Sequence, residues 1–196
     1  MKLLSVDCCI SQRGKDSRTR ALADAFLEAF RASHPTAEVE TVEPAALGLR
    51  SFDPEMLNDR DALAGIGAWD APVFEEARRF RAADGIVVAA PFWDLSFPSV
   101  LRTYIEYICA NGLAYHYEAD GCHGDCKASR LVYLTSGGDF EREDSVGVTY
   151  WRQLAAMFGI PRFDYVFAGG LDACPDTAEE TLTASCTLAR SLAAES

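Results

Sequence analysis

The sequence lacks the features that would assign it to a membrane or to a secretory route. No apolar run approaches the roughly 20 residues that a membrane-spanning helix needs. The first residues, MKLLSV, are like the start of a signal peptide, but Asp7 interrupts them and no small-residue cleavage site follows. We therefore expect a cytoplasmic protein that does not bind membranes.

Basic residues are also scarce. The chain of 196 residues has 18 Lys and Arg against 30 Asp and Glu, which gives a formal net charge of −12. A surface with this charge repels the phosphate backbone of nucleic acids. The composition therefore argues against a nucleic-acid partner.

Neither a disulfide framework nor a metal-binding motif is evident. The chain has seven cysteines, and an odd number without a secretion signal argues against a set of disulfides. Cys122 and Cys126 flank His123 and are suggestive of a metal site, but their spacing is C-x3-C and the chain has three histidines in all. A structural zinc usually has four ligands. The fourth would have to come from a remote residue or from another subunit, so we expect no metal.

Two common phosphate-binding motifs are missing as well. Cys9 stands where a P-loop needs its first glycine, and Gly14-Lys15 is followed by Asp16 in place of Ser or Thr. No G-x-G-x-x-G follows the first expected strand, so a dinucleotide-type Rossmann site is disfavoured. A site for a monophosphate remains compatible with the sequence.

Strand and helix patterns alternate along the chain. Apolar or alternating segments predict strands over residues 2–8, 37–42, 85–90, 129–135 and 162–168. Amphipathic segments predict helices over 17–32, from about 70, from 96–99 to 108, around 151–158 and over 177–194, and a further short helix is compatible with 54–64. These patterns predict one domain over residues 1–196, with an α/β fold in which a doubly wound, five-stranded parallel sheet has helices on both faces.

Two smaller expectations concern local structure. The helix that begins near Pro72 should bury Val73, Ala77 and Phe80 as its apolar stripe. The segment 111–128 is long, rich in glycine and cysteine, and without periodicity, and a loop of that length in a compact domain is usually functional or disordered.

The loop after the first strand combines hydroxyl and basic side chains. Its members of these two kinds are Ser11, Ser17, Thr19, Arg13, Lys15, Arg18 and Arg20. Doubly wound folds place phosphate-binding turns between the first strand and the first helix. The loop is therefore a candidate phosphate site, although a solvated loop with an ordinary helix cap is also compatible with these residues.

An aromatic loop follows the third strand. Pro91 cannot donate a hydrogen bond within a sheet, so the strand should end there and leave Phe92 and Trp93 at its carboxyl end. Hydroxyls within 96–99 should cap the next helix, with Pro98 in its first turn. Open α/β sheets bind ligands at this edge. The two aromatic side chains either flank a planar ligand or cap the core.

Four segments together resemble a known family. AAPFWDLSFPSVLRTYIE (89–106), NGLAYHYEADG (111–121) and LTSGG (134–138) resemble flavodoxin-like NAD(P)H:quinone oxidoreductases, including FMN-dependent azoreductases. CISQRGKDSRTRA (9–21) is also similar to the phosphate loop of NADPH-dependent FMN reductases. The resemblance extends over 2–168. It implies the flavodoxin-like form of the doubly wound fold.

The resemblance implies a bound FMN held by three turns. The turn that would surround its phosphate contains Cys9, Ser11, Ser17, Arg18 and Thr19. The turn that would line the isoalloxazine ring contains Pro91, Phe92, Trp93, Asp94 and Leu95. The turn that would close the other side of the ring contains Ser136, Gly137, Gly138 and Asp139.

The resemblance also implies an activity. NADH or NADPH would give a hydride to the flavin, and a quinone or an azo-type acceptor would then take two electrons, with no side-chain general acid assigned. Family members are homodimers with the site at the interface, so we expect a homodimer here. Tyr115 and His116 would contact the acceptor, unless they only pack the loop or an interface. The alternatives are an NAD(P)H-dependent FMN reductase, a flavodoxin-type electron carrier and a binding protein that has lost FMN.

Two residues depart from the family pattern. Azoreductases that resemble this chain commonly have Ser at the position of Cys9 and Asn at the position of Asp94, and a thiol is the weaker hydrogen-bond donor. An ionised Asp94 would oppose the negative charge that the flavin gains on reduction. We therefore expect Asp94→Asn to raise the flavin potential, and an unchanged redox titration would rule this out.

Overall fold

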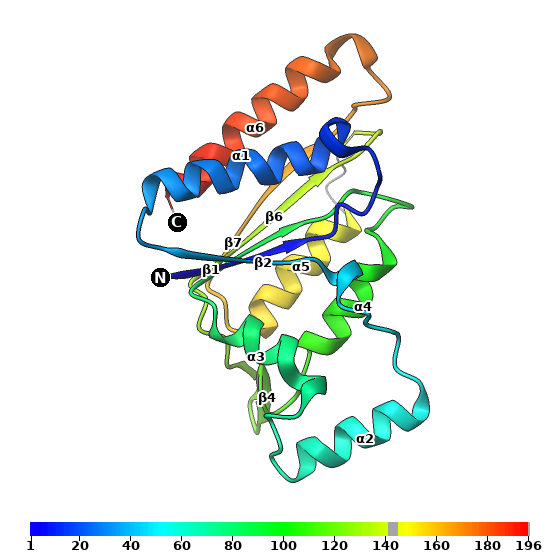
Figure 1. Cartoon of the computed structure of the whole chain (residues 1–196), viewed down its shortest axis with the longest axis vertical. Helices are drawn as coiled ribbons and strands as arrows, with labels where there is room; N and C mark the ends of the chain where they lie inside the picture. Colours follow the sequence, from blue (N-terminus) through cyan, green and yellow to red (C-terminus); the bar gives the residue numbers. More distant parts are fainter. Residues whose placement is uncertain (141–144, 196) are drawn as a thin grey trace.

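A five-stranded parallel sheet runs through the centre of the computed structural model, which describes residues 1–140 and 145–195 (Figure 1). Across the sheet the order is β2-β1-β3-β6-β7. The strands are β1 (Lys2–Asp7), β2 (Glu38–Val42), β3 (Gly85–Ala89), β6 (Arg130–Ser136) and β7 (Arg162–Ala168). This is the flavodoxin-like order, so the expected fold class is confirmed.

The strand order creates a crevice at the carboxyl ends of β1 and β3. From β1 the chain crosses outward to β2 and then returns to β3 on the other side of β1, so connections leave these two strands toward opposite faces. Open α/β sheets bind ligands at such a switch point. The loops after β1 and β3 are the two that the sequence marks as phosphate-like and aromatic.

Helices cover both faces of the sheet (Figure 1). One face packs against α1 (Arg18–Ser33) and α6 (Ala178–Ala194), and the other against α3 (Glu75–Ala82), α4 (Ser99–Ile108) and α5 (Val146–Met157). Successive strand residues point to opposite faces, so Val87 joins Phe26 of α1, whereas Val88 joins Trp151 of α5. Both sides of the sheet are therefore buried, as the apolar strand sequences predict.

The helix α2 (Pro54–Gly65) stands away from the sheet, and none of its residues is buried (Figure 1). It begins where the sequence allows a short helix, because the Asp53 carboxylate accepts a hydrogen bond of 2.9 Å from the Met56 N–H and Pro54 occupies the first turn. With α2 the described residues contain six α-helices, one more than the five expected to alternate with the strands.

The segment 111–128 is not the irregular loop that the sequence predicts. It contains an antiparallel hairpin of β4 (Tyr115–Glu118) and β5 (Gly121–Gly124). Each strand has four residues and little apolar alternation, so periodicity could not reveal it. A Cβ atom on Gly124 would overlap the backbone of Phe158 and Gly159, which shows how closely the hairpin packs against the turn between α5 and β7.

Two helix starts also differ from the prediction. Pro98 is the N-cap residue of α4, ahead of its first turn, and no side chain caps this helix. A short 3-10 helix over Pro72–Phe74 precedes α3 and rotates the chain, so Phe74 is buried in place of the half-buried Val73. Ala77 and Phe80 are buried as expected. No helix in the described ranges is long and apolar enough to cross a membrane.

Candidate functional site

Turns that follow four strands converge on one cleft at the carboxyl edge of the sheet. The cleft has a volume of about 130 Å³. Its lining residues are Ser11, Arg13, Ser17, Arg18, Thr19, Pro91, Phe92, Trp93, Ser136, Gly137, Gly138 and Asp172. Residues predicted from three separate stretches of sequence therefore lie together in space.

The loop after β1 forms one end of the cleft. This end is polar, and α1 begins there. The Ser17 hydroxyl accepts a hydrogen bond of 3.4 Å from the Arg20 N–H and caps α1. The hydroxyls of Thr19 and Ser136 are both buried and lie 2.6 Å apart, so they fix the first loop to the turn after β6. The first N–H groups of a helix have no acceptor within the helix, and together with the helix dipole they favour an anion.

An ion pair closes this polar end. Arg18 Nη1 lies 2.7 Å from Asp172 Oδ1, and the two side chains are 32% and 72% exposed. Asp172 lies in the turn after β7, and its N–H donates to the Gly138 carbonyl at 3.0 Å. A Cβ atom on Gly138 would collide with the Asp172 carboxylate, so glycine is needed for this approach. An exposed carboxylate therefore already holds the arginine that a phosphate would use.

Cys9 lies beside the cleft without lining it. Its side chain is buried in the apolar cluster that includes Leu22, and burial raises the pKa of its thiol well above the usual range, so the thiol stays neutral. Its N–H donates to Asp7 Oδ1 at 2.8 Å, and Arg20 donates to its carbonyl at 3.2 Å. A phosphate contact by Cys9 remains a prediction, and the Lys15 side chain lies outside the part of the structure that is described.

The aromatic turn has an unusual backbone. Trp93 and Ser96 exchange two backbone hydrogen bonds of 3.2 and 2.8 Å around a two-residue turn. The two central residues, Asp94 and Leu95, have φ values of 51° and 63°. Turns of this kind usually contain Asn-Gly, because the left-handed region costs other residues about 1–2 kcal/mol each. Backbone strain of this kind concentrates at functional sites.

A second hollow of about 100 Å³ continues from the first, and Phe92 lines both. Its lining residues are Phe92, Leu95, Asp139, Phe140, Ser145, Val146 and Phe167. Asp94 lines neither hollow and is exposed. The connections after β3 and β6, together with β7, therefore supply an apolar surface beside the polar cleft.

Two observations test whether FMN fits this surface. The Ser145 hydroxyl is buried and has no hydrogen-bonding partner among the described residues, so it can donate a hydrogen bond to a polar atom of a ligand or accept one from it. A Cβ atom on Gly137 would lie 3.2 Å from both Phe92 and Phe167, which leaves little space for a side chain between backbone and rings. A planar ring edged by polar atoms, with a phosphate at the end of α1, matches these residues.

Tyr115 and His116 do not line the cleft. They lie on the β4–β5 hairpin, which packs against the turn between α5 and β7. Hydrogen bonds to Asp125 at 2.8 Å and to Glu118 at 3.2 Å raise the pKa of His116. Contact between an acceptor and these two residues stays a prediction, and a single chain does not bring them to the cleft.

The two cysteines of the C-x3-C segment do not form a joint site. Cys122 is exposed, whereas the Cys126 thiol donates toward the Ala114 carbonyl at 3.7 Å. The ligand atoms of Glu118, Asp120 and His123 do lie within 4.8 Å of one another on the exposed hairpin.

Several residues of the two hollows were not predicted from the sequence. They are Phe140, Ser145, Val146, Phe167 and Asp172. One signal was available for Asp172, because it follows Gly169 and Gly170 at the end of the fifth strand, as Asp139 follows Gly137 and Gly138 at the end of the fourth. A ligand at the carboxyl edge should be reached from several strand ends.

Comparisons with known proteins agree with this geometry. A family model described as a flavodoxin-like fold matches residues 1–190. The chain is 33% identical over 171 residues to the FMN-dependent NADH:quinone oxidoreductase 2 of Clostridium acetobutylicum, with 85% of both chains covered. It is 29% identical over 197 residues to the FMN-dependent NADH:quinone oxidoreductase of Clostridium perfringens, with 98% of both covered. The solved structure of an azoreductase from Bacillus anthracis superposes with a TM-score of 0.85 at 26% identity, with both chains covered completely.

Proposed function

This chain belongs to the flavodoxin-like family, and we propose that it is an oxidoreductase that uses bound FMN to carry electrons from NADH to a quinone or an azo compound. The observation that carries the proposal is the convergence of the hydroxyl-bearing and aromatic turns on one cleft. When bound there, FMN supplies the redox chemistry by accepting a hydride and passing on two electrons. The protein residues hold, orient and shield it.

The polar end of the cleft suits the phosphate of FMN. The guanidinium groups of Arg13 and Arg18 supply positive charge in a chain of net charge −12. The hydroxyls of Ser11, Ser17 and Thr19 donate hydrogen bonds, and the first turn of α1 adds backbone N–H groups. Exchange of the Asp172 carboxylate for phosphate at Arg18 keeps that arginine paired when FMN binds.

The apolar part of the cleft suits the flavin ring. Phe92 and Trp93 present aromatic surface, while Gly137 and Gly138 allow the backbone to approach the ring closely. The tight turn at Asp94 and Leu95 fixes the backbone that would face the ring edge. The buried Ser145 hydroxyl gains a partner. No side chain of the cleft is assigned as a proton donor.

A second copy of this chain is the proposed partner. The hollows of about 130 and 100 Å³ are small for a cofactor, since ligand sites are typically about 300–1,000 Å³, so the ring would remain partly uncovered. Trp93, Leu95, Phe140 and Val146 are 40–65% exposed around them and form an apolar surface that a homodimer would bury. The partner would also be the source of any contact from Tyr115 or His116.

Two further proposals concern the chain as a whole. Because the family model spans residues 1–190 without interruption, we propose a single domain. All seven cysteines are unpaired, which suits a reducing compartment and supports a cytoplasmic location.

The experiment is to purify the protein, saturate it with FMN and add NADH without oxygen. We expect a yellow protein whose flavin absorbance bleaches with NADH and returns when a simple quinone is added. A protein that remains colourless with FMN would contradict the proposal. Loss of the flavin in gel filtration after NADH would favour an FMN reductase, and bleaching without turnover of a quinone would favour an electron carrier.

A further inference from the structure

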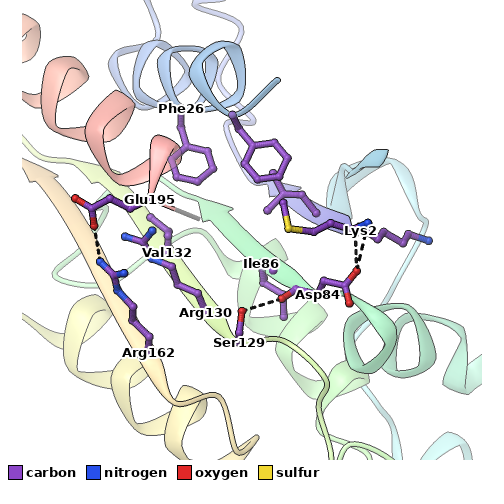
Figure 2. A pocket seen from close by; sticks show the side chains of 13 residues that line it. Lys2, Phe26, Asp84, Ile86, Ser129, Arg130, Val132, Arg162 and Glu195 are labelled. Carbon is purple, nitrogen blue, oxygen red and sulfur yellow. Dashed lines mark hydrogen bonds and ion pairs between the residues drawn. The ribbon is translucent and has the colours of Figure 1, made fainter. Parts of the chain in front are cut away.

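A separate pocket lies at the opposite, amino edge of the sheet. It has a volume of about 210 Å³ and is bounded by the first residues of β1, β3, β6 and β7, by α1 and by the residue that follows α6. Figure 2 shows the ring of Phe26 pointing from α1 toward Val132 of the sheet, with Arg130, Arg162 and Glu195 to one side. None of its lining residues belongs to the candidate FMN site.

The inner wall of this pocket is apolar. Leu3 and Val132 come from the sheet, Phe26 and Phe30 come from α1, and all four are at most 3% exposed. An apolar cavity of about 150 Å³ with a lining of this kind stays dry and binds benzene. The pocket therefore has space for one phenyl ring with a short chain attached.

The mouth of the pocket carries two neighbouring arginines. Arg130 and Arg162 are paired in register on β6 and β7, and their Nε atoms lie 2.6 and 2.7 Å from the same oxygen of Asp164. Arg130 is 5% exposed and also donates to the Leu192 carbonyl at 2.6 Å, so its guanidinium is fixed. Arg162 is half exposed and reaches the solvent side of the pocket.

A carboxylate of the chain itself already pairs with Arg162. Glu195 Oε2 is 2.7 Å from Arg162 Nη2, and the Glu195 side chain is 56% exposed (Figure 2). Exposed ion pairs of this kind contribute little to stability, so a competing anion can displace the carboxylate. Glu195 therefore shows the position that the carboxylate of a ligand would take.

We propose that this pocket binds a small aryl carboxylate, with its ring between α1 and the sheet and its carboxylate on Arg162 in place of Glu195. The apolar wall alone would accept any small ring, and the arginine at the mouth selects the anionic ones. Two groups of opposite charge at 2.7 Å give a charge-assisted hydrogen bond, which is roughly twice as strong as a neutral one. The site does not depend on FMN, because the two ligands would bind at opposite edges of the sheet.

The test uses 3-phenylpropionate as the probe and the FMN-loaded full chain. Methyl NMR resonances of Leu3 and Val132 report the pocket directly, whatever the enzyme activity. We expect both to shift, and the flavin absorbance to stay unchanged. Arg162→Gln should weaken binding about two- to fivefold, because it removes an exposed charged hydrogen-bonding partner. The neutral amide, 3-phenylpropanamide, should bind the unmodified protein more weakly than 3-phenylpropionate does, by a similar factor.

Glu195→Gln is the matched second variant. It leaves both arginines in place and removes the competing charge, so it should strengthen probe binding about two- to fivefold. A thermal melt of each variant separates a lost site from a lost fold. The proposal is overturned if the methyl resonances do not move, if the amide binds as tightly as the carboxylate, or if Glu195→Gln weakens binding. A probe that changes the flavin spectrum in place of the methyl resonances would also overturn it.

Discussion

The cleft at the carboxyl edge of the sheet and the pocket at its amino edge are built differently. At the carboxyl edge the walls are turns, in which Gly137, Gly138 and the left-handed residues Asp94 and Leu95 bring the backbone to the surface. At the amino edge the walls are side chains of strands and helices. The first suits a ligand that is recognised largely through backbone groups and hydroxyls, and the second suits one recognised by shape and charge.

The cleft and the amino-edge pocket nevertheless share one feature. Each has an arginine held by an exposed carboxylate of the chain, Arg18 with Asp172 and Arg162 with Glu195, both at 2.7 Å. The comparison predicts that amino-edge variants change stability without changing flavin affinity. Variants that remove a ligand contact at the carboxyl edge should change flavin affinity with little change in stability.

The largest effect is expected from Phe26→Ala. Phe26 is 1% exposed between α1 and the sheet, and loss of such a ring should lower the free energy of unfolding by about 3–5 kcal/mol. Urea unfolding measures this, and Leu188→Ala on α6, which is 49% exposed, is the control that should change it by less than about 0.5 kcal/mol. FMN affinity below the melting temperature should be unchanged. A large loss of affinity would show that α1 couples the two edges.

The next effect concerns the arginine of the carboxyl edge. Arg18→Gln should weaken FMN binding about tenfold, because it removes a charged partner of the phosphate. Asp172→Asn should strengthen it, since the competing carboxylate is gone while the side chain keeps its size. Flavin fluorescence quenching measures both affinities, with riboflavin, which has no phosphate, as the control ligand. Equal losses for FMN and riboflavin would place Arg18 away from the phosphate.

The sequence predicted the carboxyl edge far better than the amino edge, and the reason is physical. Turns need particular residues, so Pro91, Gly137 and Ser17 mark their positions in the sequence. The wall of the amino-edge pocket consists of residues such as Val132, which are chosen by the same apolar pattern whether they fill a core or line a cavity. A cavity forms where the side chains of neighbouring elements leave space between them. The hydrophobic periodicity of the sequence does not reveal such a space.

The strands and the packed faces were predictable for a related reason, because apolar runs and helical stripes repeat over many residues. The strand order was expected only from the family resemblance. The hairpin at 115–124 was not, since each of its strands has only four residues. Asp172 was missed because a single acidic residue after a glycine pair is a weak signal without the spatial arrangement of the strand ends.

Leu95→Gly should have a moderate effect that tests the strained turn. Glycine removes the cost of the left-handed conformation but adds freedom to the unfolded chain, so we expect a gain of about 0.5–1 kcal/mol. The melting temperature should rise by about 2 °C for a chain of this length. Leu57→Gly on α2 is the matched control and should be destabilising by about 1 kcal/mol, since its backbone is helical. A decrease for Leu95→Gly would mean that the leucine side chain contributes more than the backbone conformation costs.

The smallest effect concerns His116 on the hairpin. Its pKa is raised from 6.5 by hydrogen bonds to Asp125 and then to Glu118. A raised pKa means that protonation stabilises the folded hairpin. That contribution is fully present below the unfolded value, near 6.5, and is lost as the pH rises through the higher folded value. A pH titration of the His116 ring protons by NMR measures the midpoint, with the urea-unfolded chain as reference. Asp125→Asn should lower the folded midpoint toward that reference, and a folded midpoint at or below the reference would contradict the expected charge pairing.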